Sequence, residues 1–111
     1  MPPKKLDPAD EIEAMSDLID ECNDALSNQN LTPDQRKLFT QLYSASRDAY
    51  WMASEAGFSK SNAYIVTKTK ELAEANQELK DDLQSLQDLS ETLQKIETAV
   101  STALVLAALL A

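Results

Sequence analysis

The sequence predicts an all-α protein built as a single helical domain. The chain of 111 residues contains one glycine and four prolines, and all four prolines precede residue 34. Good helix formers fill the rest, apolar residues recur at steps of three and four, and patterns typical of strands are scarce. With 43% hydrophobic residues the chain can build one core. We therefore expect a flexible N-terminal tail over residues 1–6 and one helical domain over residues 7–111.

A first helix is predicted over residues 8–27. Asp7 followed by Pro8 is typical of a helix start, because the aspartate side chain can cap free amides and proline fits the first turn. An apolar stripe at helical spacing then follows: Ile12, Met15, Leu18, Ile19, Cys22, Ala25 and Leu26. The hairpin partner of this helix comes directly after it.

A second helix is predicted over residues 33–56. Thr32 and Gln35 have the spacing of a capping box, in which each side chain satisfies a main-chain amide of the other residue. Gly57 can adopt the left-handed conformation that ends a helix, and Phe58 can supply the hydrophobic contact that often follows. We therefore expect a helical hairpin to precede the rest of the chain.

The remaining chain is predicted to form one long helix over residues 60–111. It contains neither proline nor glycine, and seven residues recur at intervals of seven: Ile65, Leu72, Leu79, Leu86, Leu93, Val100 and Ala107. Such a helix would span roughly 75 Å, whereas the two shorter helices would each span about 30–36 Å. The hairpin could cover only half of it. We therefore expect an oligomeric helical bundle or coiled coil, and a break near Asn76 or Asp81–Asp82 that gives a monomeric four-helix bundle is the alternative.

Residues 79–111 are the predicted oligomerisation segment because the first seam position is apolar throughout and the second is apolar from Leu89 on, with Leu83 compensating for Asp82. Uncharged residues flank the seam, which favours three or four helices at the seam, or a dimer of hairpins, over a two-stranded coil. The predicted seam residues are Leu79, Leu86, Leu89, Leu93, Ile96, Val100, Ala103, Ala107 and Leu110.

The residue content argues against catalysis, and we expect no catalytic, cofactor-binding or metal-binding residues. The chain has no histidine, which removes the usual general base and most zinc ligands, and its single cysteine cannot form a thiolate cage. One glycine cannot build a phosphate-binding loop. Cys22 lies on the apolar stripe and is expected to be a buried structural thiol.

The charge balance limits the partners. Nineteen acidic and ten basic residues give a net charge of −9, which disfavours binding to nucleic acid. The acidic N-terminal region lacks the pattern of a cleavable signal peptide, so a cytoplasmic location is expected, with export by a signal-independent route left open.

One predicted surface could bind a partner protein. Carboxylates lie opposite the apolar stripe of the first helix, either as a solvated face or as a docking strip for a basic partner. Aromatic residues on the second helix either pack in the core or contribute binding energy at an interface. The candidate residues are Asp10, Glu13, Asp17, Asp20, Glu21, Asp24, Tyr43, Tyr50 and Trp51.

The apolar C-terminus does not favour a membrane anchor. Residues 99–111 would cover roughly 20 Å as a helix, and a bilayer core needs about 20 apolar residues. An interfacial helix usually carries a basic face, which is missing here. Membrane association is therefore disfavoured.

The sequence predicts a non-catalytic adaptor or scaffold protein that self-associates through its C-terminal heptads and presents its hairpin to a partner. A small acidic inhibitor, immunity protein or chaperone that binds a basic or hydrophobic client is an alternative. A membrane-surface protein is a third possibility.

Overall fold

The structure is a computed structural model that describes residues 7–56 and 62–110. Those residues form four α-helices and no strand: α1 (Pro8–Ser27), α2 (Pro33–Ala56), α3 (Ala63–Leu83) and α4 (Leu89–Leu110). The all-α prediction is confirmed, and the bounds of α1 and α2 agree with the predicted ranges. The predicted tail over 1–6, the stop at Gly57 and Phe58, and the start of the long helix at 60–61 lie outside the described residues.

The predicted capping residues begin the first two helices. The Asp7 carboxylate accepts hydrogen bonds from the amides of Ala9 (2.9 Å) and Asp10 (3.3 Å). The capping box of α2 is formed in both directions, because the Gln35 amide donates to the Thr32 hydroxyl (3.1 Å) and the Thr32 amide donates to the Gln35 side chain (3.0 Å). These local contacts satisfy amides that would otherwise lack partners at a helix start.

The prediction of one continuous helix over residues 60–111 is wrong. The helix ends at Leu83 and the chain folds back over residues 84–88, a few positions beyond the break considered near Asp81–Asp82. Two main-chain bonds close the turn, because the Asp82 carbonyl accepts from the amides of Ser85 (3.1 Å) and Leu86 (3.0 Å). Leu86 adopts a left-handed conformation with φ of 44°. The turn lets α4 bury its apolar face, and this gain outweighs the cost of about 1–2 kcal/mol for that conformation in a residue with a side chain.

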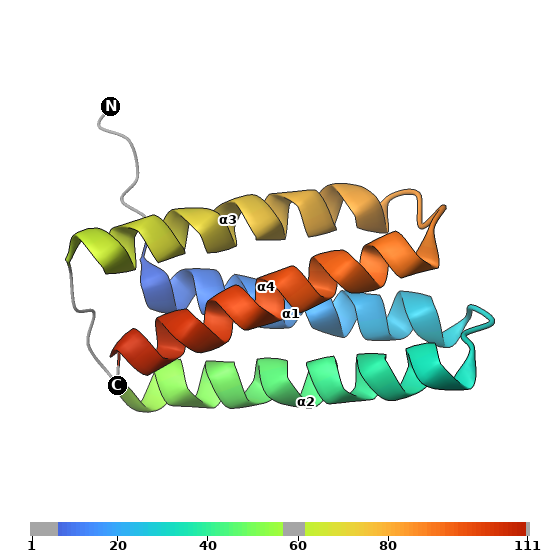
Figure 1. Cartoon of the computed structure of the whole chain (residues 1–111), viewed down its shortest axis with the longest axis horizontal. Helices are drawn as coiled ribbons and strands as arrows, with labels where there is room; N and C mark the ends of the chain where they lie inside the picture. The colour runs from blue at the N-terminus through green and yellow to red at the C-terminus, as the bar shows by residue number, and fades with distance from the viewer. Residues whose placement is uncertain (1–6, 57–61, 111) are drawn as a thin grey trace.

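The four helices run alternately up and down, and the bundle is flattened (Figure 1). α1 packs against α2 and α3, and α4 packs against the same two helices from the other side. α1 and α4 also touch across the short diagonal, whereas the described residues of α2 and α3 do not touch. The overall dimensions of 42 × 30 × 19 Å reflect this arrangement.

The core runs along the middle of the bundle and contains most of the apolar tail. α4 contributes its largest share, with Leu93, Ile96, Ala99, Val100, Ala103, Leu106, Ala107 and Leu110 all buried. Alanines on the facing side of α2, Ala49 and Ala53, are buried as well. Small side chains on both helices allow close packing. The hairpin of α1 and α2 alone could not cover the apolar tail. With α3 packed beside them, the three helices together cover it.

Cys22 on α1 is a buried thiol, as its position on the apolar stripe predicts. Burial, with smaller contributions from the nearby charges of Glu21 and Asp82, raises the pKa of Cys22 from 9.0 to about 12. We therefore expect alkylation at pH 8 to be about a thousandfold slower in the folded chain than in urea, because thiolate is the reactive form. The measurement is the rate of iodoacetamide labelling in both conditions. Equal labelling rates would contradict this placement of Cys22.

The raised pKa of Cys22 also makes the free energy of unfolding depend on pH. The thiol leaves stability unchanged at low pH, and stability falls as the pH rises above about 9.

Candidate functional site

A hollow between α1 and α2 collects part of the predicted partner surface. It has a volume of about 220 Å³, and residues of both helices line it: Glu13, Ser16, Asp17, Asp20, Arg47, Tyr50 and Trp51. The three acidic residues come from the outward side of α1, and the aromatic pair comes from the second half of α2. Trp51 is 61% exposed and Tyr50 is 38% exposed, so both rings remain available to a partner.

Arg47 is the lining residue that sequence reasoning missed. Its guanidinium lies 5.8 Å from the ring centre of Tyr43 and donates a hydrogen bond of 3.3 Å to the Tyr43 hydroxyl. Tyr43 is half-buried and its ring centre lies 6.2 Å from that of Phe39. The four-residue spacing between Tyr43 and Arg47 is the sequence pattern that indicates this contact, since residues four apart lie on the same helix face. Tyr43 therefore contacts Arg47 but does not itself line the hollow.

The other predicted surface residues remain exposed but do not line the hollow. Asp10, Glu21 and Asp24 point to solvent elsewhere on α1. The hollow thus combines three carboxylates and one guanidinium with two aromatic rings, which leaves a local excess of two negative charges. Such a surface can pair with a cation and cover an apolar side chain at the same time.

The predicted seam residues lie within the chain's own bundle. Seven of them are buried in the core: Leu79, Leu93, Ile96, Val100, Ala103, Ala107 and Leu110. Leu86 and Leu89 are half-buried at the turn between α3 and α4. Contacts within one chain therefore occupy the surface that the heptads were predicted to share between copies.

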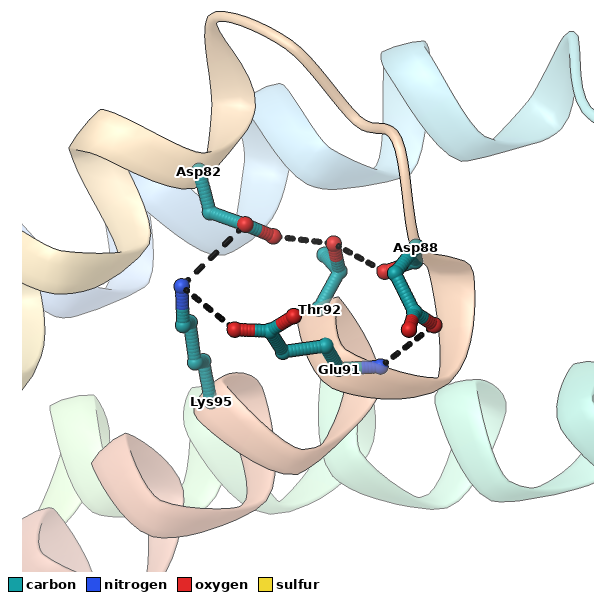
Figure 2. Close-up of polar contacts among 5 residues, drawn as sticks. All are labelled: Asp82, Asp88, Glu91, Thr92 and Lys95. Atoms are coloured by element: carbon teal, nitrogen blue, oxygen red, sulfur yellow. Dashed lines mark hydrogen bonds and ion pairs between the residues drawn. The ribbon is translucent and has the colours of Figure 1, made fainter.

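A polar cluster ties α4 to α3 at their turn (Figure 2). One oxygen of the Asp82 carboxylate accepts a hydrogen bond from the Thr92 hydroxyl, and the other accepts from the Lys95 ammonium at 3.1 Å. Lys95 also pairs with Glu91 at 3.5 Å. The Asp88 side chain caps α4 by accepting from the Glu91 amide at 3.1 Å. We refer to these five residues as the α3–α4 polar cluster.

The α3–α4 polar cluster holds the turn together. Thr92 is fully buried, and its hydroxyl lies 3.0 Å from the Asp88 carbonyl as well as beside Asp82. The hydrogen bond to Asp82 raises the pKa of Lys95 above its ordinary value, and Glu91 adds to the effect. The arrangement is that of a structural ion pair in which each charged group already has a partner.

In residues 7–56 and 62–110, no three Cys, Asp or Glu side chains come together in a way that could hold a metal ion. Within the same ranges, α4 is the one helix long and apolar enough to cross a membrane, with a mean hydropathy of 1.4 over its most apolar window. A core helix can meet the same criterion, and α4 buries one face in the core of this bundle, with 44% of that segment buried.

Comparison with known proteins adds no relative. No family model matches this chain, and no curated protein and no solved structure resembles it significantly.

Proposed function

We propose that this chain is a non-catalytic helical adaptor or scaffold protein that binds a basic segment of a partner protein at the hollow between α1 and α2. The observation that carries the proposal is Trp51, which is 61% exposed beside a hollow lined by carboxylates. Exposed tryptophans contribute binding energy at interfaces more often than most residues, because they cover a large area with few torsions to restrict.

The chemistry of the hollow suits a segment in which lysine or arginine alternates with apolar residues. A partner cation over the face of Trp51 would gain a cation–π interaction, and Asp17 and Asp20 would pair with neighbouring cations. An apolar residue of the partner would cover Tyr50. The net charge of −9 would also accelerate the encounter with a basic partner and make it sensitive to salt.

Trp51 provides a direct test because it is the only tryptophan in the chain. We expect its fluorescence to change when a capped peptide of alternating arginine and leucine is added. The corresponding glutamate–leucine peptide should leave it unchanged, and high salt should weaken the response to the arginine peptide. An absence of binding by the arginine peptide at low salt would overturn the proposal.

Matched variants separate the hollow from general charge attraction. We expect the double variant Asp17→Asn/Asp20→Asn to bind the arginine peptide about tenfold more weakly. The control is Glu21→Gln/Asp24→Asn, which removes the same charge from the same helix but outside the hollow. Binding that falls equally in both variants would show attraction to the whole acidic surface and contradict a site at the hollow.

Self-association through residues 79–111 is the second part of the proposed function. The heptad pattern supports it, since the first seam position is apolar in every heptad from Leu79 to Ala107 and the second is apolar from Leu89 to Leu110. Because seven of the nine seam residues are buried in the chain's own core, association through them requires α4 to leave that core and enter another. A chain that binds the arginine peptide but stays monomeric at every concentration would fit the alternative of an acidic inhibitor or chaperone instead.

A further inference from the structure

The heptad pattern of α3 continues without a change of phase through the turn into α4. Three of its residues are buried in α3 (Ile65, Leu72, Leu79), three are buried in α4 (Leu93, Val100, Ala107), and Leu86 lies between them in the turn. A continuous helix over residues 63–110 would keep all seven along one face if it coils around a partner helix, as heptad repeats do. The turn of residues 84–88 contains neither glycine nor proline, so its composition does not oppose a helix.

The turn also holds a residue in an unfavourable conformation. Leu86 has φ of 44°, in the left-handed region that glycine adopts readily and that crowds the Cβ atom of any other residue against the following carbonyl oxygen. Its side chain is only half-buried in this position. A straight helix would relieve the main-chain strain and bring Leu86 back onto the apolar face.

We propose that the turn between α3 and α4 is a hinge, and that two copies of this chain exchange α4 to form a domain-swapped dimer. In this dimer, residues 63–110 of each chain form one helix, and each bundle is completed by the α4 of the partner subunit. This inference rests on the self-association proposed above and specifies its mechanism.

The energetics follow from what the exchange keeps and what it changes. α4 makes the same contacts with α2 and α3 in the exchanged bundle, so the core is preserved. The hinge changes, because the strain at Leu86 disappears while the Asp88 side chain no longer caps the start of α4. The cost is the lost freedom of two separate chains, so monomers predominate at low concentration and dimers form as concentration rises.

Two substitutions of Leu86 separate the effect of main-chain conformation on dimerisation from the effect of losing the leucine side chain. Leu86→Gly and Leu86→Ala both remove the isopropyl group of the leucine, but glycine favours the left-handed turn and alanine favours the continuous helix. We expect the dimerisation constant of Leu86→Ala to exceed that of Leu86→Gly by about tenfold for each hinge, hence about 100-fold for the dimer. The measurement is size-exclusion chromatography with light scattering over a range of concentrations. Circular dichroism verifies that both variants remain helical, and equal constants for the two folded variants would overturn the hinge.

A distance measurement distinguishes exchange from ordinary association. Spin labels are attached through Glu74→Cys and Thr98→Cys, two exposed positions equally far from Leu86 on α3 and α4. The native Cys22 is buried and its pKa is raised to about 12, so it resists labelling. Chains carrying both labels are refolded with an excess of unlabelled chains, so that each dimer contains one labelled chain.

The outcomes separate this inference from the self-association on which it rests. In the exchanged dimer the two labelled positions are separated by 24 residues of continuous helix, or roughly 36 Å. In the closed hairpin they sit on adjacent helices whose axes are about 10 Å apart. A dimer with the long separation supports exchange. A dimer with the short separation overturns exchange and leaves self-association intact, and monomers at all concentrations in the wild type and in Leu86→Ala overturn both.

Discussion

Replacing Ile96 with aspartate is expected to unfold the chain instead of separating folded subunits. Ile96 is fully buried in the core of the bundle, where α4 faces the other helices. The substitution removes an apolar side chain and leaves a carboxylate without a partner in the core. We expect the free energy of unfolding to fall by at least about 4–5 kcal/mol, a large share of the total stability of a domain of this size.

The measurement is helical content by circular dichroism together with thermal unfolding. Thr98→Asp is the matched control, because it introduces the same side chain two residues further along α4 at an exposed position. Its effect should stay within about 0.5 kcal/mol. A folded, helical monomer with Ile96→Asp would contradict the core position and show that Ile96 serves only a seam between copies.

Replacing Asn76 with aspartate is the second substitution with a large expected effect. Asn76 on α3 is 6% exposed, and its amide donates to the Glu11 carbonyl (3.1 Å) and to the Glu11 carboxylate (3.3 Å). The side-chain oxygen of Asn76, Oδ1, is buried without a hydrogen-bond partner among the described residues. Asn76→Asp replaces the donor with a second carboxylate facing Glu11. We expect a loss of about 3–5 kcal/mol in the free energy of unfolding at neutral pH.

The pH dependence identifies the cause of this loss. Burial and the facing carboxylate both disfavour the charged form, so the introduced carboxyl has a raised pKa in the folded chain. A raised pKa means that stability is retained at low pH and lost as the pH rises through the folded value. The control Asn76→Leu has a similar size and no charge, and we expect it to change stability by only about 1 kcal/mol at every pH. Urea unfolding of both variants at several pH values tests this, and equal losses at acidic and neutral pH would contradict a charge effect.

The sequence predicts the helix starts well because they depend on neighbouring residues. Asp7 caps α1, and Thr32 and Gln35 cap α2, through contacts that span two or three residues. Such contacts form in any context that leaves the helix start accessible. The bounds of these two helices, 8–27 and 33–56, agree with the predicted ranges.

The break between α3 and α4 could not be predicted from local signals. Residues 84–88 contain no helix breaker, and the heptad runs through them in phase. The only local signs were Asp82 and Asp88, whose side chains join the α3–α4 polar cluster once the helices lie side by side. Both residues are also compatible with a helix interior. The turn forms because folding back buries the apolar face of α4, and that gain comes from contacts distant in sequence.

The candidate site was predicted in part. The exposed carboxylates of α1 and the rings of Tyr50 and Trp51 follow from helical periodicity, which assigns each residue to a face. Their meeting at one hollow depends on how α1 and α2 are rotated against each other, and packing of the core sets that rotation. Arg47 enters the hollow for the same reason.

The sequence alone determined that this protein is helical, where its first two helices lie, and which residues are apolar enough to be buried. Periodicity and capping carry that information because they act within one or two turns of helix. Only the tertiary structure decided which helices cover which faces, and therefore that α4 is sheltered by its own chain and that acidic and aromatic residues of α1 and α2 share a hollow. The physical reason is that the hydrophobic effect requires an apolar face to be buried, whereas the geometry of the whole bundle decides which helix buries it.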